Sequence, residues 1–314
     1  MTQLKCAVIV AAYNEEKNIA ICLDNLLGQT YSNLEIWVVD DGSTDKTVDI
    51  IEAYAKSHNN IHYIVQENKG AAKAREIGIL HCDTEFVTFL DADDLLSQDA
   101  ISLAMTEFDK NIDIVLYNLA ISQNKQNSDF KVLEYFTTDR EFTGLSAFQN
   151  CLSEWKVHGL GIFRKKVFLD SYALYKKYNK NGENYINNDE VITKLNFLNA
   201  RNVRVCEGIY YYNFNTNSTT KKANPNFYKI INNTHIIMQA CRDHNIPFNK
   251  SNIFMHDLRI VETNFKKWKS ELANVSDWKK SMRSEIKTII SSEDNSFTFK
   301  LRFKYLKKLL KTYF

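Results

Sequence analysis

Two prolines and nine glycines are few for a chain of 314 residues, and their scarcity leaves the domain boundaries poorly marked. No low-complexity linker and no internal repeat is visible. No apolar run approaches the ~20 residues that a transmembrane helix needs. No signal peptide precedes the strand-like run from Cys6 to Ala12. We therefore expect a cytoplasmic protein, which can also be peripheral at the inner face of a membrane.

The six cysteines form no CxxC pair and show no metal-ligand spacing, which argues against a disulfide framework and a zinc site. We expect them to be reduced and to pack as small hydrophobic side chains. The net charge of +2 is unevenly spread: residues 250–314 carry 15 Lys and Arg against 7 Asp and Glu, and the rest carries 25 against 31. Because this basic excess is confined to the tail and no motif that reads DNA or RNA is present, we expect no nucleic-acid partner.

Strand-like and helix-like patterns alternate through the first 120 residues. Short apolar runs predict buried strands, and the segments between them place apolar side chains on one helical face. The predicted strands are 6–12, 34–39, 61–65, 86–90 and 114–117. This alternation predicts a parallel sheet with right-handed crossovers. Farther along, the patterns predict helices near 143–152, 164–177 and 189–199, strands near 158–163, 203–206 and 209–214, and mainly helix after Pro225.

Polar loops follow the first, second and fourth predicted strands. They are Ala11–Glu15, Asp40–Asp45 and Asp91–Asp94. Since the carboxyl ends of parallel strands share one edge of a sheet, the three loops can surround one ligand. Carboxylates suit Mg²⁺ or Mn²⁺, which usually share their coordination with substrate phosphates. The alternative is ordinary strand-to-helix turns, with Asn14 capping one helix and Ser43 or Thr44 capping the next.

Four segments together resemble the bacterial family-two inverting glycosyltransferases with the GT-A fold. They are Val8–Glu15 (VIVAAYNE), Val38–Asp45 (VVDDGSTD), Asn68–Arg75 (NKGAAKAR) and Phe89–Asp94 (FLDADD). The resemblance implies an α/β fold, Rossmann-like, with a mostly parallel sheet, flanking helices and a helical C-terminal extension. The implied domains are a nucleotide-sugar-binding half at 1–120, an acceptor-binding half at 121–222, and a helical region with a basic amphipathic tail at 223–314.

The resemblance also implies a site for a UDP-sugar donor. Its nucleotide-sugar-binding residues would be Ala11, Tyr13, Glu15, Asp41, Asn68, Arg75, Asp91 and Ala92. Tyr13 offers a ring face on which a base can stack, and Asp41 can accept the imide N–H of uracil or a ribose hydroxyl. Asp93, with Asp91, would bind the Mn²⁺ or Mg²⁺ that bridges the two phosphates. Glu76 departs from the family, which usually has Asn at that position.

The family's second signature is an acidic pair at the start of a helix, followed by a tyrosine run. Here Asp189 precedes Glu190, and Tyr210–Tyr212 follow. The resemblance implies that Asp189 is the general base, which takes the proton of the acceptor hydroxyl in a single inverting displacement. Because Asn188 replaces the first acid of the pair, Glu190 is an alternative base. In a further alternative, Asp189 only caps the helix and complements its dipole.

Two further positions leave alternatives open. Asn213 stands where the family has an arginine in the loop that closes over the donor, so Lys221 either contacts phosphate instead or is solvated. His158 either completes a metal shell or a sugar site, or it is a hydrogen-bonded structural residue.

The C-terminal segment 297–314 is basic and amphipathic. Its cations are Lys300, Arg302, Lys304, Lys307, Lys308 and Lys311, and its apolar face would contain Phe299, Phe303, Leu306, Leu310 and Tyr313. Such a helix either lies on an anionic membrane surface or packs on the domain with a solvated basic face. Lipid-linked glycan acceptors lie at the same membrane surface, so a membrane-binding tail agrees with a glycosyltransferase that acts on such acceptors.

We therefore expect a metal-dependent hexosyl- or N-acetylhexosaminyltransferase that adds a single sugar to a cell-envelope glycan such as lipopolysaccharide, capsule or O-antigen. The missing Gln-x-x-Arg-Trp motif of processive synthases favours single addition. One alternative is a nucleotidyltransferase, which would need a Gly-rich basic loop where Tyr13–Glu16 stands. The other is a non-catalytic, membrane-docked scaffold with a vestigial site, although Asp41, Asp91 and Asp93 are all intact.

Overall fold

The computed structural model describes residues 4–124, 126, 128–152, 156–183, 186–213 and 223–311, without the side chains of Leu310 and Lys311. The chain divides into two compact units. The first comprises Met1–Cys151, Trp155–Ala173 and Ile192–Asn215, and the second comprises Leu152–Glu154, Leu174–Val191 and Thr216–Phe314. The boundaries expected after residues 120 and 222 stay a prediction.

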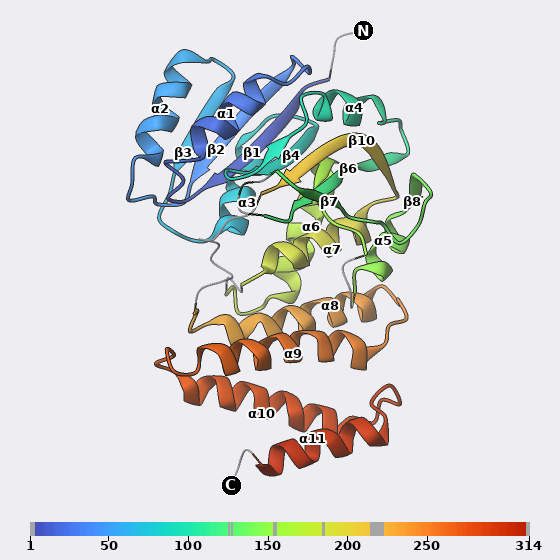
Figure 1. The fold of residues 1–314 in the computed structure, drawn as a ribbon. Coiled ribbons are helices and arrows are strands. Elements are labelled where there is room, and N and C mark those ends of the chain that lie inside the picture. The colour runs from blue at the N-terminus through green and yellow to red at the C-terminus, as the bar shows by residue number, and fades with distance from the viewer. Residues whose placement is uncertain are drawn as a thin grey trace. The chain divides into compact units, whose positions relative to one another are not determined.

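A mixed sheet forms the first unit (Figure 1). Its strand order is β3-β2-β1-β4-β9-β6-β10-β5. Its first four strands are parallel neighbours, as the alternating sequence pattern predicts. They are β1 (Cys6–Ala12), β2 (Leu34–Asp40), β3 (Ile61–Val65) and β4 (Phe86–Asp91). β1 lies between β2 and β4 and is buried except for a partly exposed Ala11, which is the burial expected of a central parallel strand.

The second half of the sheet departs from a simple parallel order. β9 (Gly161–Arg164) runs antiparallel between β4 and β6 (Ile112–Ser122), and β6 pairs in parallel with β10 (Asn202–Tyr212). The sequence predicts separate strands near 203–206 and 209–214, whereas β10 is one strand whose register shifts between Val205 and Ile209. Short strands complete the sheet: β5 (Leu95–Leu96) and β8 (Glu141–Thr143) pair with β10, and β7 (Phe130–Val132) pairs with β6.

Helices cover both faces of the central strands. α1 (Ile19–Leu27) and α4 (Ala100–Thr106) bury their apolar side chains in one core with Val8 and Val10 of β1. On the opposite face, α3 (Ala71–His81) lies so close to β1 that a Cβ at Gly78 would be 2.4 Å from Cγ2 of Ile9. The chain also forms α2 (Thr47–Ser57), α5 (Gly144–Asn150), α6 (Lys165–Tyr178) and α7 (Asn188–Asn199). The division between the compact units falls within α6 and α7.

The second unit is helical after Pro225, as the sequence predicts. η2 (Phe227–Ile230) precedes α8 (Ile231–Asp243), α9 (Lys250–Trp268), α10 (Val275–Ser291) and α11 (Phe299–Lys311). Trp278 is fully buried against Phe227 and Trp268, and its indole N–H donates to the Pro225 carbonyl at 3.0 Å. None of the helices in the described ranges combines the length and apolar character needed to cross a bilayer.

Candidate active site

The three loops singled out in the sequence meet at one edge of the first unit's sheet. In the strand register, Ala12 lies opposite Asp40 of β2, and Ala11 lies opposite Asp91 of β4. β1, β2 and β4 therefore end side by side. Backbone hydrogen bonding continues past the strands, because the Asp41 N–H donates to the Ala12 carbonyl at 2.8 Å.

The helix caps expected in these loops are wrong. α1 begins at Ile19 and α2 at Thr47, and neither has a side-chain hydrogen bond from its N-cap residue. Asn14, which has a φ of 55°, instead accepts the Thr44 N–H at 2.8 Å, and its own N–H donates to Ser43 Oγ at 2.8 Å. These polar side chains therefore tie the first loop to the second rather than capping their own helices.

Asp41 organises the loop that follows β3. Its side chain is 3% exposed, and its carboxylate accepts three hydrogen bonds. The donors are Gln66 Nε2 at 2.6 Å, the Lys69 N–H at 2.7 Å and the Gly70 N–H at 2.7 Å. Gln66 lies just before the Asn68–Arg75 motif and was not predicted to take part in the site. Its Oε1 is buried and, within the described part of the chain, accepts no hydrogen bond.

Arg75 and Asp91, which were selected from separate motifs, form an ion pair. The Arg75 guanidinium carbon also lies 5.7 Å from the centroid of the Phe89 ring on β4. The Asp91 N–H donates to the Tyr210 hydroxyl at 3.2 Å. The end of β4 is thus connected to α3 through Arg75 and to β10 through Tyr210. Glu76, next to Arg75, instead pairs with Lys73 at 2.7 Å.

Asp93 lines an open cavity of about 430 Å³ at the end of β4. Other lining residues are Asn18, Cys22, Ala92, Phe130, Tyr211 and Asn213. Asp93 therefore places a carboxylate in a cavity that is accessible to a ligand. Ile21, which also lines this cavity, is exposed, so its wall is partly apolar.

Asp94 has a different environment, and no separate role was predicted for it. It is buried, and it accepts the Tyr210 hydroxyl at 2.8 Å and the Asn213 N–H at 2.7 Å. Burial, followed by the nearby charges of Asp91 and Asp93, raises its pKa well above the ordinary value. Asn213 Nδ2 also donates to the Asp93 carbonyl at 2.8 Å. These contacts fasten the end of β10 to the acidic loop, and the sequence drew attention to both partners, Tyr210 in the tyrosine run and Asn213 in the loop after it, but not to their bonds with Asp94.

The remaining donor-site candidates border the same edge. Tyr13 is 43% exposed, which leaves its ring accessible to a ligand. Glu15 accepts a hydrogen bond from Asn18 Nδ2 at 2.6 Å. Burial is the largest cause that raises the Glu15 pKa; the Asn18 hydrogen bond opposes it, and the charge of Asp93 adds to it. Asn68 is exposed, and its backbone nitrogen lies 3.0 Å from the position that a Cβ on Gly42 would take.

The donor set at this edge suits a divalent cation that the substrate helps to bind. Asp91 and Asp93 supply hard carboxylate oxygens on one loop. Among the described residues, no three His, Cys, Asp or Glu side chains are grouped so that they could hold an ion. Mg²⁺ is commonly bound in this way, by one or two carboxylates together with substrate phosphates. The residues therefore fit Mg²⁺ or Mn²⁺ better than an all-protein zinc cage.

Asp189 and Glu190 lie in the first turn of α7, within the second compact unit. Asn187, with a φ of 59°, precedes the helix, and its Nδ2 donates to Glu190 Oε1 at 3.2 Å. Two acids in a first turn interact favourably with the helix dipole and stabilise the helix. The capping alternative and the base hypothesis are therefore both compatible with this position. Lys221 lies outside the described residues.

His158 has the geometry of a structural histidine. It is buried, its Nδ1 accepts the Leu160 N–H at 3.1 Å, and its Nε2 lies 2.5 Å from the Tyr135 hydroxyl oxygen. Both ring nitrogens are therefore engaged within the first unit, which favours the structural alternative over a metal or sugar ligand.

Comparisons with known proteins agree with this architecture. A sequence model described as glycosyl transferase family 2 matches residues 7–170. The glycosyltransferase GlyG of Streptococcus pneumoniae serotype 4 is 27% identical over 66% of this chain and 69% of its own length. A second pneumococcal glycosyltransferase, GlyA, is 34% identical over 46% of this chain, and the match spans only 21% of its length.

A solved structure supports the same fold. Residues 1–349 of TarS from S. aureus superpose with a TM-score of 0.68 at 22% identity, over 99% of this chain and 89% of that one. TarS 1–349 has also been solved in complex with UDP-GlcNAc and with UDP. At this level of identity the likeness concerns the fold, and it confirms the GT-A architecture with a helical C-terminal region.

Proposed function

This chain belongs to glycosyl transferase family 2 and is a glycosyltransferase with the GT-A fold, and on that premise we propose that it transfers a single sugar from a UDP-sugar to a hydroxyl of a cell-envelope glycan. The observation that carries the proposal is the convergence of three loops at one sheet edge, where Arg75 pairs with Asp91 beside the cavity lined by Asp93. The UDP-GlcNAc and UDP complexes of TarS support a UDP-linked donor.

The uridine binds between the first loop and the loop that Asp41 holds. Tyr13 stacks on the base through its exposed ring, and the small side chain of Ala11 leaves room beside it. Asp41 already accepts three hydrogen bonds, and a carboxylate has about four acceptor positions. Asp41 therefore has about one acceptor position left for the imide N–H or a ribose hydroxyl. Glu15 and Asn68 border this pocket.

Asp93 and Asp91 would hold Mn²⁺ or Mg²⁺, with Ala92 between them, and a bound ion would supply Lewis-acid stabilisation of the charge on the departing nucleoside diphosphate. Arg75 positions the Asp91 carboxylate through their ion pair. A mannosyltransferase from Pyrobaculum calidifontis, solved with GDP-Man and Mn²⁺, superposes with a TM-score of 0.51 at 19% identity, over all of this chain and 83% of that one. It supports use of a divalent ion by this fold.

Asp189 serves as the general base, with Glu190 as the second candidate. The acceptor oxygen forms a bond to the anomeric carbon as the bond from that carbon to the phosphate oxygen breaks. The acceptor proton passes to the carboxylate, and the electron pair leaves with the diphosphate. Because attack and departure occur on opposite faces, the configuration at the anomeric carbon is inverted.

The acceptor is a glycan presented at the inner membrane surface, and α11 brings the enzyme to it. Phe299, Phe303 and Leu306 are exposed on α11, and Lys300, Lys304 and Lys307 lie among them in the sequence. Exposed apolar side chains interspersed with cations are typical of helices that lie on anionic membranes.

Calorimetric titration of UDP with and without Mn²⁺ tests the donor site. We expect Mn²⁺ to strengthen UDP binding to the native protein, and Asp93→Ala to remove that effect. Asp139→Ala, which deletes an exposed carboxylate of the same unit, is the matched control. Asp189→Asn should retain UDP binding but lower the transfer rate by ~100-fold or more. Mn²⁺-dependent binding that survives in Asp93→Ala would contradict the site, and full transfer by Asp189→Asn would shift the base role to Glu190.

A further inference from the structure

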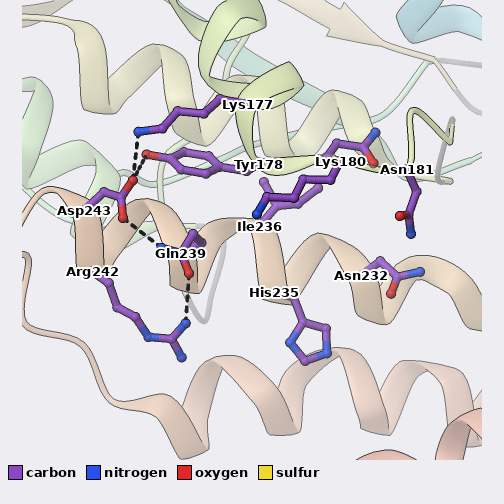
Figure 2. Close-up of a pocket in the computed structure, with 11 residues that line it drawn as sticks. Lys177, Tyr178, Lys180, Asn181, Asn232, His235, Ile236, Gln239, Arg242 and Asp243 are labelled. Atoms are coloured by element: carbon purple, nitrogen blue, oxygen red, sulfur yellow. Dashed lines mark hydrogen bonds and ion pairs between the residues drawn. The ribbon is translucent and has the colours of Figure 1, made fainter.

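A second cavity, of about 510 Å³, lies wholly within the second unit (Figure 2). One wall is the end of α6 and the turn after it, which supply Lys177, Tyr178 and residues 179–181. The other wall is one face of α8, which contributes Asn232, His235, Ile236, Gln239, Arg242 and Asp243. The spacing of three and four residues along α8 places these side chains on one helical face. Ten of the eleven lining residues have a polar group in their side chain, which is unusual for the pocket of an apolar ligand.

A hydrogen-bonded cluster closes one end of this cavity (Figure 2). The Asp243 carboxylate accepts Lys177 Nζ at 2.9 Å, the Tyr178 hydroxyl at 3.1 Å and Gln239 Nε2 at 2.8 Å. Lys177 therefore neutralises Asp243. The acidic residue of the lining is satisfied by its neighbours and does not repel an anionic ligand.

The remaining charge of the lining is positive. Arg242 Nη1 donates to Gln239 Oε1 at 3.2 Å, which leaves most of its five donors for other acceptors. Lys180 is exposed on the opposite wall. His235 also lines the cavity, and its Nε2 lies 3.4 Å from Glu285 Oε1. Lys180 and Arg242 thus present two cations to the cavity that Lys177 and Asp243 do not cancel.

A buried acceptor in the same lining calls for a ligand that can donate. Asn179 is 8% exposed, and its Nδ2 donates to the Glu183 carbonyl at 2.7 Å, which fixes the amide. Its Oδ1 is buried and accepts no hydrogen bond from any residue in the described part of the chain. A buried polar atom left without a partner is costly, and the hydroxyl group of a bound sugar would satisfy it.

We propose that this cavity binds an acidic glycan, with the anionic group on Lys180 and Arg242 and a sugar hydroxyl donating to Asn179 Oδ1. The amides of Asn181 and Asn232 provide further hydrogen bonds to hydroxyl groups. The proposal rests on the proposed function, because it identifies the ligand as part of the acceptor glycan. It deepens that function by assigning the acceptor a negative charge, from either a phosphate or a carboxylate.

Three hexasaccharide probes of equal length test this site by calorimetric titration of the full chain. They are hexagalacturonate, which carries carboxylates, maltohexaose bearing a terminal phosphate, and neutral maltohexaose. We expect at least one anionic probe to bind more tightly than maltohexaose, and the tighter anionic probe identifies the acidic group. Lys180→Ala/Arg242→Ala should weaken binding of that probe by roughly tenfold or more. Lys279→Ala/Lys280→Ala, which removes two exposed cations from α10 of the same unit, should leave it unchanged.

Hydrogen exchange locates the bound probe. Protection on adding the tighter anionic probe should appear in peptides that cover residues 177–183 and 232–243. Equal binding of the anionic and neutral probes, or equal losses in the pocket variant and the Lys279/Lys280 control, would overturn the proposal. UDP titration of Lys180→Ala/Arg242→Ala distinguishes failure of the glycan-site proposal from failure of the proposed donor site. Unchanged Mn²⁺-dependent UDP binding by this variant shows that the first unit is intact.

Discussion

The side chain of His158 shows how one buried residue makes the fold sensitive to acid. Because Nδ1 accepts the Leu160 N–H, the ring proton of the neutral form is on Nε2 and is donated to the Tyr135 hydroxyl. The Tyr135 hydroxyl in turn donates to the Tyr117 carbonyl at 2.6 Å. A proton on Nδ1 would break the first of these bonds. Burial accordingly lowers the pKa of His158 to about 3.

His158 should therefore lower the stability of the protein as the pH falls. The unfolded chain takes up a proton near the ordinary pKa of about 6.5, whereas the folded chain resists it. The contribution is present in full above pH 6.5 and is lost between pH 6.5 and 3. We expect the free energy of unfolding to fall by about 2 kcal/mol from pH 7 to pH 5 because of His158. Urea denaturation at both values measures this.

The matched variants are His158→Gln, which keeps an acceptor and a donor, and His244→Gln, at an exposed histidine. His158→Gln should lose less stability between pH 7 and 5 than the native protein. His244→Gln should behave as the native protein does. An identical acid loss in native protein and His158→Gln would show that this histidine does not titrate with unfolding.

At the level of residues, the motifs predicted that the three loops share one edge of the sheet, but not what their side chains bond to. Asn14 looked like a helix cap because that is its commonest local use, yet it binds Thr44 of another loop. Asp41 looked like a free acceptor, yet it holds the loop that contains Gln66. These partners lie 25 to 30 residues away in the chain, and periodicity along the sequence carries no information about them.

β9 is the element that makes the sheet mixed, and its position depends on one glycine. This four-residue strand lies between β4 and β6 and is antiparallel to both. At Gly161 the neighbouring backbone comes so close that a Cβ would lie 2.2 Å from the Val115 carbonyl oxygen and 2.7 Å from the Leu116 Cα. Backbone atoms of a central strand cannot move away as a flexible side chain can.

Gly161→Ala should therefore destabilise the sheet, by about 1–3 kcal/mol, a typical cost of overpacking. The free energy of unfolding from urea denaturation measures this. Gly28→Ala is the control, because Gly28 has a φ of −82° and a Cβ there would meet its nearest atom at 3.3 Å. It should change the stability by less than about 1 kcal/mol. Equal effects of the two substitutions would mean that the contact between β9 and β6 relaxes at little cost.

Among the elements, the strands of the first 91 residues were predicted well because each repeats a local pattern of apolar strand, polar loop and helix. The strand near 158–163 was also predicted, but its insertion between β4 and β6 was not. That insertion pairs Phe86 with Arg164 and Ile114 with Phe163. Pairings between segments so far apart in sequence are fixed by the packed sheet rather than by local propensity.

For the whole molecule, family membership decides between the alternative functions that the sequence left open. A nucleotidyltransferase is not supported, because the family match covers residues 7–170 and includes all three loops. The six cysteines are free and buried, as expected for residues that pack as small hydrophobic side chains. The basic excess of the last 65 residues is most asymmetric in α11, where Lys and Arg occur without any Asp or Glu.

Two faces of α11 meet different surroundings. Tyr305 is buried, Lys308 pairs with Glu262 of α9, and Arg302 Nε donates to the Phe297 carbonyl at 2.7 Å, so one face is docked within the second unit. Phe299 is 82% exposed on another face. The two alternatives drawn from the sequence, a docked helix and a membrane-binding helix, are therefore compatible with each other.

Because the docked face holds the helix in place, the exposed face can be changed without removing α11. Phe299→Ser/Phe303→Ser/Leu306→Ser should reduce binding to vesicles of phosphatidylglycerol and phosphatidylethanolamine by roughly tenfold or more, since it removes apolar area that would enter the lipid. Binding of the native protein should weaken in high salt and on phosphatidylcholine alone, because each cation near an anionic leaflet contributes about 1 kcal/mol. Leu80→Ser/Leu145→Ser/Leu169→Ser, at three exposed apolar positions of the first unit, is the control in vesicle sedimentation. If the α11 variant sediments as the control does, another surface binds the lipid, and the exposed phenylalanines then need a different explanation.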